Sequence, residues 1–518
     1  MYDRDPMQAF PFVRPLLLAG LLLTGDAAAG AAPAADALGA VRAELAQALD
    51  PILADPALRR AKVGVHVVRL TDGAELYTRA ADTLLVPASN VKILTTAAAL
   101  RVLSPDYQFP TEVYGALKPS GQVVGDLVVK GYGDPYLVPE RVWYLASRLY
   151  FLGVREILGD IVIDDAYFDG PRMGNGSEQD RTSNAYMAPA GAVSVGFNAL
   201  MVHILPGASV GDDARVMLEP LSSYATVQGQ VRTVATGRSS ISVEVVPQGG
   251  RSVVKLSGRI GQNDPGRGYW RRIDEPPLFA GEVLRSALGQ VGVQVRGKVR
   301  RGALPPESPQ LLSLTSPRLA ELIGPLNKYS NNFMATQVAF AMGAKRFGAP
   351  GTWDKARQTF DEFLTGEVGL AKGSYTLSNA SGLHDVNRLT PRQMVQVLGY
   401  MYGQPQLYPE FIGSLAVAAG SGTLQDRMAD THAAHLLRAK TGTLSMASAL
   451  SGYVTAKSGE PLAFSIIVNG YQGIEGVWAA QDRFGSALAG TNMSLREAGT
   501  ALTTSEDDGL AAPDGARP

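Results

Sequence analysis

A serine and a lysine three positions apart are the residues of this chain whose types and spacing best fit nucleophilic catalysis. Ser89 and Lys92 stand at the start of an apolar run, residues 93–100, that predicts a helix, and Pro87 fits the helix start. Both side chains then lie on one face of the first turn, where the positive helix N-terminus favours a serine alkoxide. A lysine whose pKa is lowered by burial or by a neighbouring cation can act as its base. The competing interpretation is a capping serine beside a solvated lysine.

The same four-residue pattern occurs a second time, at Ser252 and Lys255. That copy lies in a β-branched, alternating segment that predicts a strand. Side chains three apart on a strand face opposite sides of the sheet, so these two would not meet. We therefore expect no catalytic role for Ser252.

A second motif, Ser330-Asn331-Asn332, lies between two predicted helices. A loop at this place can direct Ser330 and Asn332 into a cleft. A hydroxyl there can pass a proton to a leaving amine, and an amide can hold both the substrate and the lysine. The alternative is an ordinary N-cap of the following helix.

A third motif, Lys440-Thr441-Gly442-Thr443, comes just before two predicted paired strands. A lysine and two hydroxyls are suited to binding a terminal carboxylate. The glycine lets a substrate lie against the strand edge without a Cβ in the way. The alternative is a tight turn that leads into the strand.

With these three motifs in this order, the chain resembles the low-molecular-mass class C penicillin-binding proteins, the serine D-Ala-D-Ala carboxypeptidases/endopeptidases of the S13 peptidase type. The resemblance covers about residues 40–490 and extends beyond the three motifs. Further matching segments are residues 125–127, 131–135, 161–165, 192–195, 381–383, 422–424 and 463–466.

The resemblance implies a role for each motif. Ser89 would be the acylated nucleophile, with Lys92 as its base. Ser330 and Asn332 would serve proton transfer and amide positioning. The segment Lys440-Thr441-Gly442-Thr443 would bind the terminal carboxylate. The N–H groups of Ser89 and Thr443 would form the oxyanion hole.

The resemblance also bears on substrate specificity. Asp164 and Phe168 match positions that face the stem peptide in relatives. In many relatives a basic residue that could grip the side-chain carboxylate of the diamino acid follows the segment at Ser381, but here that position is Asp385. Arg388, three residues further, could replace it.

The fold that the resemblance implies is α/β (α+β). It consists of a serine β-lactamase-like transpeptidase domain, an antiparallel sheet flanked by helices, with two smaller inserted domains, one of them mostly β. The expected division is a signal peptide at 1–35, the peptidase domain at 36–114 and 313–493, an inserted α/β domain at 115–205 and 274–312, a small all-β domain at 206–273, and a disordered tail at 494–518.

The pattern of apolar residues predicts the elements that position these motifs. Helices are expected over 38–50, 142–152, 279–288, 319–327, 332–342, 353–364, 391–402 and 476–488. Strands are expected over 63–70, 74–78, 123–129, 156–164, 193–205, 215–218, 227–234, 240–246, 252–259, 291–299, 447–454 and 462–469. Thr390 and Pro391 are expected to cap and to begin the helix that follows them.

Composition excludes several classes of function. The 518 residues carry a net charge of -1 without a long basic or acidic block, so no nucleic-acid partner is expected. The chain has no cysteine, which excludes disulfides, thiolate catalysis and cysteine metal sites. Its five histidines show no metal-binding pair at helical i, i+4 spacing, and we expect neither a metal nor a cofactor.

The N-terminus predicts export. Arg14 precedes an apolar stretch, residues 15–23, that is too short to span a membrane but fits the core of a cleavable signal, with a mature start between residues 30 and 36. The alternatives are a buried helix or an uncleaved anchor. A nucleophile-elbow pattern at 207–211 lacks a following helix and is expected to be incidental.

Two functions of different class remain open. The first is a periplasmic serine D-Ala-D-Ala carboxypeptidase, with possible endopeptidase activity on cross-links, that acts on peptidoglycan stem peptides and is acylated by β-lactams. The second is a non-catalytic wall-binding or sensor protein that keeps the fold. The intact Ser89, Lys92, Ser330, Asn332 and Lys440 favour the enzyme, because a non-catalytic descendant is free to lose them. The oligomeric state does not follow from the sequence.

Overall fold

The computed structural model describes residues 31–174, 176, 182–235 and 237–492, with side chains from residue 38 onward. The apolar core of the predicted export signal and the predicted tail from residue 494 lie outside these ranges. Val41–Ser494 is one compact unit, and helix α1 (Ala31–Leu53) includes its first residues. That helix is longer than the expected 38–50.

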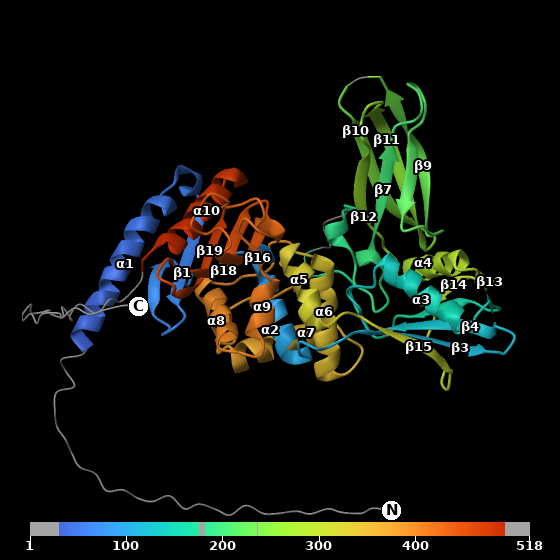
Figure 1. Ribbon diagram of the computed structural model, residues 1–518, viewed down its shortest axis with the longest axis horizontal. Helices are drawn as coiled ribbons and strands as arrows, with labels where there is room; N and C mark the ends of the chain where they lie inside the picture. Colours follow the sequence, from blue (N-terminus) through green and yellow to red (C-terminus); the bar gives the residue numbers. More distant parts are fainter. Residues whose placement is uncertain (1–30, 175, 177–181, 236, 493–518) are drawn as a thin grey trace, which may run out of the picture. The chain divides into compact units, whose positions relative to one another are not determined.

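A six-stranded antiparallel sheet joins segments from both ends of this unit (Figure 1). Its strand order is β16-β17-β18-β19-β1-β2. The strands are β1 (Lys62–Arg69), β2 (Glu75–Arg79), β16 (Ala416–Val417), β17 (Leu437–Leu444), β18 (Ala447–Thr455) and β19 (Pro461–Asn469). The predicted hairpin of β1 and β2 and the predicted pair β18 and β19 are thus confirmed.

Helices on both faces of this sheet explain the composition of its central strands. Ala463 and Ile467 of β19 lie in one apolar cluster with α8 (Pro391–Tyr402), whereas Phe464 contacts Phe484 of α10 (Ile474–Gly490). Every residue from 462 to 468 is buried. Because both faces of β19 are covered, its buried residues are apolar except for Ser465, whose hydroxyl accepts a hydrogen bond from Ser451.

A helical cluster surrounds α2 (Val91–Leu103), whose side chains are nearly all buried. Its other members are α5 (Leu319–Lys328), α6 (Asn332–Phe347), α7 (Trp353–Glu362), the π-helical turn Phe363–Glu367, α8 and α9 (Tyr408–Ser414). Thr390 caps α8 through a reciprocal capping box with Gln393, and Pro391 is its first residue, as predicted.

A second sheet has seven strands, all of which come from the chain between residues 110 and 315. Its order is β13-β5-β4-β3-β15, with β6 paired to β4 and β14. The strands are β3 (Pro110–Leu117), β4 (Gln122–Gly131), β5 (Glu156–Ile157), β6 (Ile161–Asp164), β13 (Gln294–Val295), β14 (Val299–Arg301) and β15 (Gln310–Thr315). Helices α3 (Pro139–Phe151) and α4 (Pro276–Gln290) contact each other and share one apolar cluster with the sheet.

Two strand predictions in this region are wrong. Residues 156–164 form two strands instead of one, because the strand is interrupted around Gly159. There the Gly159 N–H donates to the carbonyl of Gly125, and a Cβ would lie 2.5 Å from that backbone. The predicted strand over 291–299 is reduced to β13 and β14.

The predicted domain borders at 114/115 and 312/313 fall inside β3 and β15, which pair with each other. A border that cuts two hydrogen-bonded strands would leave their backbone groups unpaired. We propose that the first inserted domain begins before Pro110 and ends after Thr315, and the division into domains otherwise stays a prediction.

The remaining strands form two three-stranded sheets, ordered β10-β11-β9 and β12-β7-β8. They are β7 (Ala199–Leu205), β8 (Arg215–Glu219), β9 (Ala225–Val234), β10 (Ser240–Gln248), β11 (Arg251–Gly261) and β12 (Arg267–Arg272). On β11, Ser252 is buried and Lys255 is exposed. The second serine–lysine pattern therefore lies on a strand and splits across its two sides, as predicted.

Contacts with α6 hold the segment around residues 191–197 beside the first residue of that helix. The fully buried side chain of Gln337 exchanges hydrogen bonds with the backbone of Gly191, at 2.9 and 3.1 Å. The ring of Phe197 meets that of Phe333 with centroids 6.2 Å apart. Because α6 begins at Asn332, these contacts bring the segment after residue 182 next to a predicted site residue.

Candidate active site

Ser89 lies in a 3₁₀ turn, η2 (Ala88–Asn90), that leads directly into α2. We expected it in the first turn of an α-helix. The difference preserves the alignment with Lys92, because a 3₁₀ turn has three residues and side chains three apart eclipse each other. The side chain of Asn90 donates a 2.7 Å hydrogen bond to the Ser451 hydroxyl of β18, which fixes the turn against the sheet.

The side-chain amine of Lys92 is fully buried and makes three hydrogen bonds. Its Nζ lies 3.0 Å from Ser89 Oγ, 2.7 Å from Asn332 Oδ1 and 2.5 Å from the carbonyl oxygen of Ser381. The two residues of the first motif therefore converge, and they meet a residue of the second motif that is 240 positions away in the chain.

Burial lowers the pKa of Lys92 well below its usual value, and the nearby charge of Lys440 lowers that pKa further. All three hydrogen-bond partners of its Nζ are uncharged oxygens, so none of them compensates the charge of the protonated form. The lowered pKa favours the unprotonated amine that a general base requires.

The three residues of the second motif, Ser330, Asn331 and Asn332, make different contacts. Asn331 caps α6, since its side chain accepts the N–H of Met334 at 3.0 Å. Asn332 holds Lys92 through Oδ1 and donates from Nδ2 to the Tyr186 carbonyl at 3.1 Å. Ser330 accepts a hydrogen bond from Lys440 at 2.9 Å. The capping interpretation therefore applies to Asn331. The side chains of Ser330 and Asn332 instead contact the two lysines.

The third motif lies on β17 and meets the second one. Lys440 is fully buried, and its Nζ donates to Ser330 Oγ at 2.9 Å and to the carbonyl of Thr441 at 2.7 Å. Burial lowers the pKa of Lys440 to about 7. Thr441 donates to the hydroxyl of Thr423 at 2.7 Å, and Thr443 is exposed on the same strand. A lysine and hydroxyls are thus gathered where a carboxylate can bind.

Two glycines allow the η2 turn to approach its neighbours closely. A Cβ on Gly442 would lie 2.8 Å from the Pro87 carbonyl oxygen and 3.0 Å from the Ser89 nitrogen. Gly382 has φ of +75°, and its Cβ would lie 1.9 Å from the Ala88 carbonyl oxygen. The structure thus gives Gly442 a second role, in the seating of Ser89, beside the one expected at the substrate.

The contacts of Asp164 and Phe168 are with residues outside the three motifs. The buried carboxylate of Asp164 accepts hydrogen bonds from the backbone N–H groups of Ala166 and Leu304. Phe168 is also buried, and its ring forms a T-shaped contact with that of Phe340, with ring centroids 5.4 Å apart. These contacts stabilise the inserted segment, and the role of the two residues in facing a substrate stays a prediction.

Three groups at the site were not among the predicted residues: the Ser381 carbonyl on Lys92, the Tyr186 carbonyl on Asn332 and the Thr423 hydroxyl on Thr441. Ser381 and Thr423 lie in segments that already resembled the family, and that signal could have identified them. Two of the three contacts use a backbone carbonyl, which every residue type offers, so the sequence carries little information about them.

Asp385 and Arg388, the two positions considered for binding the side-chain carboxylate of the diamino acid, lie in one loop. Asp385 is exposed and lines a cavity of about 1060 Å³ together with His384 and Leu444. The guanidinium of Arg388 donates to the backbone carbonyls of Asp385 and Asn387. Its role as a replacement for the missing basic residue stays a prediction.

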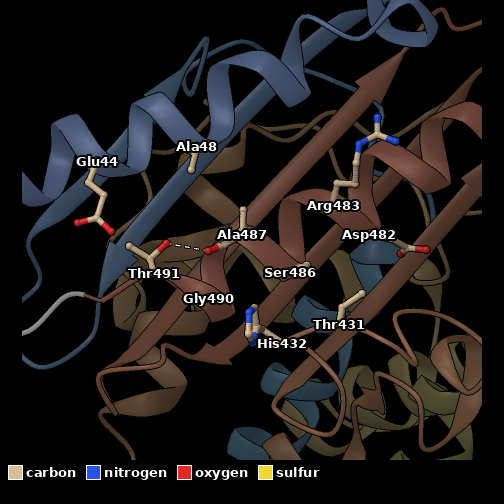
Figure 2. A pocket seen from close by; sticks show the side chains of 10 residues that line it. All are labelled: Glu44, Ala48, Thr431, His432, Asp482, Arg483, Ser486, Ala487, Gly490 and Thr491. Atoms are coloured by element: carbon tan, nitrogen blue, oxygen red, sulfur yellow. Dashed lines mark hydrogen bonds between the residues drawn. The ribbon is translucent and has the colours of Figure 1, made fainter.

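A separate cavity of about 470 Å³ lies between α1 and α10 (Figure 2). Glu44, His432, Asp482 and Thr491 are among its lining residues, and Thr491 bonds to the carbonyl of Ala487. It contains none of the residues of the three motifs. Within the described part of the chain, no group of three or more histidine, aspartate or glutamate residues is placed to hold a metal ion.

Two further sequence features can be placed. The elbow-like pattern at 207–211 joins β7 to β8, so a strand and not a helix follows it, which confirms the expectation. Across residues 31–492, apart from the gaps given above, no helix is both long and apolar enough to cross a membrane.

Comparisons with known proteins give the family that the sequence matches. Residues 45–485 match the sequence profile of the D-Ala-D-Ala carboxypeptidase 3 (S13) family. A D-alanyl-D-alanine carboxypeptidase of Actinomadura sp. (strain R39) is 37% identical over 476 residues, which are 89% of this chain and 87% of that protein. A D-alanyl-D-alanine carboxypeptidase of Haemophilus influenzae, DacB, is 24% identical over 75% of this chain and 81% of its own.

Solved structures extend the likeness to the fold. Penicillin binding protein 4 of Haemophilus influenzae superimposes with a TM-score of 0.74 at 22% identity, over 86% of this chain and 98% of that one. The same protein complexed with a β-lactam superimposes with a TM-score of 0.67 at 22% identity, over 86% and 97%. The expected fold, a transpeptidase-like domain with inserted domains in a mixed α/β chain, is thereby confirmed.

Proposed function

This chain belongs to the D-Ala-D-Ala carboxypeptidase 3 (S13) family, and we propose that it cleaves peptidoglycan stem peptides or their cross-links through an acyl-enzyme on Ser89. Its activity class is that of a serine-type D-Ala-D-Ala carboxypeptidase. The observation that carries the assignment of Ser89 is the 3.0 Å contact between its hydroxyl and the amine of the fully buried Lys92. Burial gives that amine the lowered pKa that an acceptor of the serine proton needs.

Acylation uses the three motifs together. Ser89 Oγ attacks the carbonyl of the penultimate D-alanine while its proton moves to Lys92 Nζ. The N–H groups of Ser89 and Thr443 hold the developing oxyanion. As the C–N bond breaks, Ser330 Oγ protonates the leaving nitrogen and is resupplied from Lys440. Water then attacks the ester and releases the acyl product from Ser89.

Lys440 serves the substrate as well as the proton path. Protonated, it is the cation nearest Ser330, and the hydroxyls of Thr441 and Thr443 lie along the same strand. This set binds the terminal carboxylate of a carboxypeptidase substrate. The requirement for a free carboxylate beside the leaving nitrogen separates a D-Ala-D-Ala peptidase from a general serine protease.

The proposal includes β-lactams as inhibitors, stem peptides as substrates and the periplasm as the place of action. A β-lactam presents a carboxylate and a strained amide, so it can use the same nucleophile and the same Lys440 strand. The support for inhibition is the fold shared with a relative that was solved in complex with a β-lactam. The support for export is the apolar stretch at residues 15–23.

The decisive experiment is the release of D-alanine from a stem pentapeptide by the full chain. We expect steady release by the purified protein and its suppression by prior treatment with penicillin. A well-folded protein that releases no D-alanine but still binds purified peptidoglycan would favour the alternative, a wall-binding protein without catalysis. The binding measurement, made on the same preparation, distinguishes these two outcomes.

The pH dependence of kcat/KM follows from the two lysines. Below the lowered pKa of Lys92 its amine is protonated and cannot accept the serine proton, so activity is lost on the acid side. Above about pH 7 Lys440 loses the charge that binds the carboxylate, so activity falls again. Lys440→Arg keeps that charge at higher pH but cannot resupply the proton of Ser330, so we expect a lower maximal kcat/KM together with an alkaline limb that moves to higher pH. An alkaline limb that does not move would show that another group causes it.

A further inference from the structure

The outward side of α3 carries exposed aromatic rings. The helix packs its other side, which includes Val142, Leu145 and Leu149, into the apolar cluster that it shares with the seven-stranded sheet. On the outward side Tyr144 and Phe151 are seven residues apart, two turns along one ridge, and they are 46% and 81% exposed. The outer side of a surface helix normally carries polar residues, so packing within the described chain does not account for these rings.

Two neighbouring side chains enlarge this apolar surface. Trp143 stands next to Tyr144 on the helix and is 50% exposed, and Leu152, at the C-cap of α3, is 44% exposed. We call Trp143, Tyr144, Phe151 and Leu152 the α3 patch. Single exposed apolar residues are ordinary on protein surfaces, whereas several large ones on one short helix mark an interaction site.

The charged residues beside the α3 patch are arginines. The guanidinium of Arg148 lies over the ring of Tyr144, 5.9 Å from its centroid, and that of Arg155 lies over the ring of Tyr150 at 3.9 Å. Arg148 donates to the Tyr144 hydroxyl and Arg155 to the Tyr150 carbonyl, and within the described part of the chain neither is paired with a carboxylate. The acidic residue of α3 is Glu140, in its first turn. The C-terminal end of the patch is therefore bordered by positive charge.

This combination favours an anionic lipid surface over other occupants of an apolar face. A second copy of the chain, related by two-fold symmetry, would bring the same two arginines against each other. A neutral glycan would leave both guanidiniums without a charge to match them. A phospholipid surface suits both parts, because tryptophan and tyrosine rings settle between headgroups and acyl chains and arginines bind phosphates.

We propose that the α3 patch, together with Arg148 and Arg155, docks the protein on an anionic phospholipid surface, with α3 lying in the plane of the interface. A helix of 13 residues is too short to cross the hydrocarbon core, so the contact is peripheral and reversible. Its strength comes from burial of the aromatic rings and from the attraction of the two arginines to lipid phosphates. The inference goes beyond the proposed function and does not depend on the reaction at Ser89.

The direct test is sedimentation of the full chain with lipid vesicles. Vesicles of equal parts phosphatidylglycerol and phosphatidylcholine are compared with vesicles of phosphatidylcholine alone, at low and at high salt. We expect binding to the anionic vesicles to be about tenfold tighter or more, and this preference to be lost at high salt, because salt screens exposed charges. No binding to the anionic vesicles, or equal binding to both kinds, would overturn the inference.

Two double variants show whether the α3 patch is responsible, rather than the apolar stretch at residues 15–23. The first is Tyr144→Ser with Phe151→Ser, which removes the exposed ridge. The second is Arg148→Gln with Arg155→Gln, which removes the charge and leaves the rings. Each is expected to weaken binding to the anionic vesicles by about tenfold or more. Unchanged binding in both double variants would contradict the proposal.

The matched controls change similar residues elsewhere. Trp270→Ser alters a ring of β12 that is 49% exposed, and Arg215→Gln with Arg259→Gln removes two exposed arginines of β8 and β11. Both controls are expected to bind the vesicles like the unaltered chain, and an equal loss in them would count against the α3 patch. If the aromatic double variant does not fold, the arginine double variant provides the comparison. A dimer that forms without vesicles, and that the aromatic double variant abolishes, would assign the patch to a second copy instead.

Discussion

The Ser89→Ala variant is expected to lose D-alanine release by on the order of 10⁴-fold or more in kcat/KM and to show no covalent labelling by fluorescent penicillin. The reason is that, in the proposed mechanism, the hydroxyl at 3.0 Å from Lys92 is the atom that forms the acyl bond. The measurement is labelling followed by denaturing electrophoresis, together with the hydrolysis rate.

The matched control for this variant is Ser252→Ala. Ser252 belongs to the other serine–lysine pattern; it is buried, whereas Ser89 is partly exposed, and its lysine lies on the opposite side of β11. Its labelling and activity are expected to equal those of the unaltered chain. Labelling that persists in Ser89→Ala and disappears in Ser252→Ala would reverse the assignment of the nucleophile.

The Lys92→Met variant is expected to acylate about 10²- to 10⁴-fold more slowly, because the methionine cannot accept the serine proton. The side chain is similar in length, so Ser89 should remain in place. The loss of three hydrogen bonds and the removal of a costly buried amine act on stability in opposite directions. The measurement is the rate of labelling by fluorescent penicillin, with the melting temperature as a check of folding.

Two further variants make this prediction specific. Lys92→Arg is expected not to restore the rate, since a guanidinium stays protonated at every accessible pH. Lys255→Met removes the exposed lysine of the other pattern and is expected to have no effect. Rapid labelling of Lys92→Met, or rescue by Lys92→Arg, would rule out Lys92 as the base.

The fold was predictable wherever a short stretch of chain decides its own structure. The capping box of Thr390 and Gln393 spans one turn, and the hairpin of β1 and β2 spans one turn and its flanks. Interactions over so few residues leave a pattern that can be recognised without knowledge of the rest. The break between β5 and β6 left no such pattern, because it depends on Gly125, 34 positions before Gly159.

The sequence alone determined which residues are chemically able to do the work: a serine and a lysine one turn apart, followed by two further polar motifs. Only the tertiary structure decided that Asn332 meets Lys92 and that Lys440 meets Ser330, which brings the three motifs together. The pKa of Lys92 belongs to the second group as well. It depends on burial by several elements and on Lys440, a residue 440 − 92 = 348 positions away, and no local pattern encodes either.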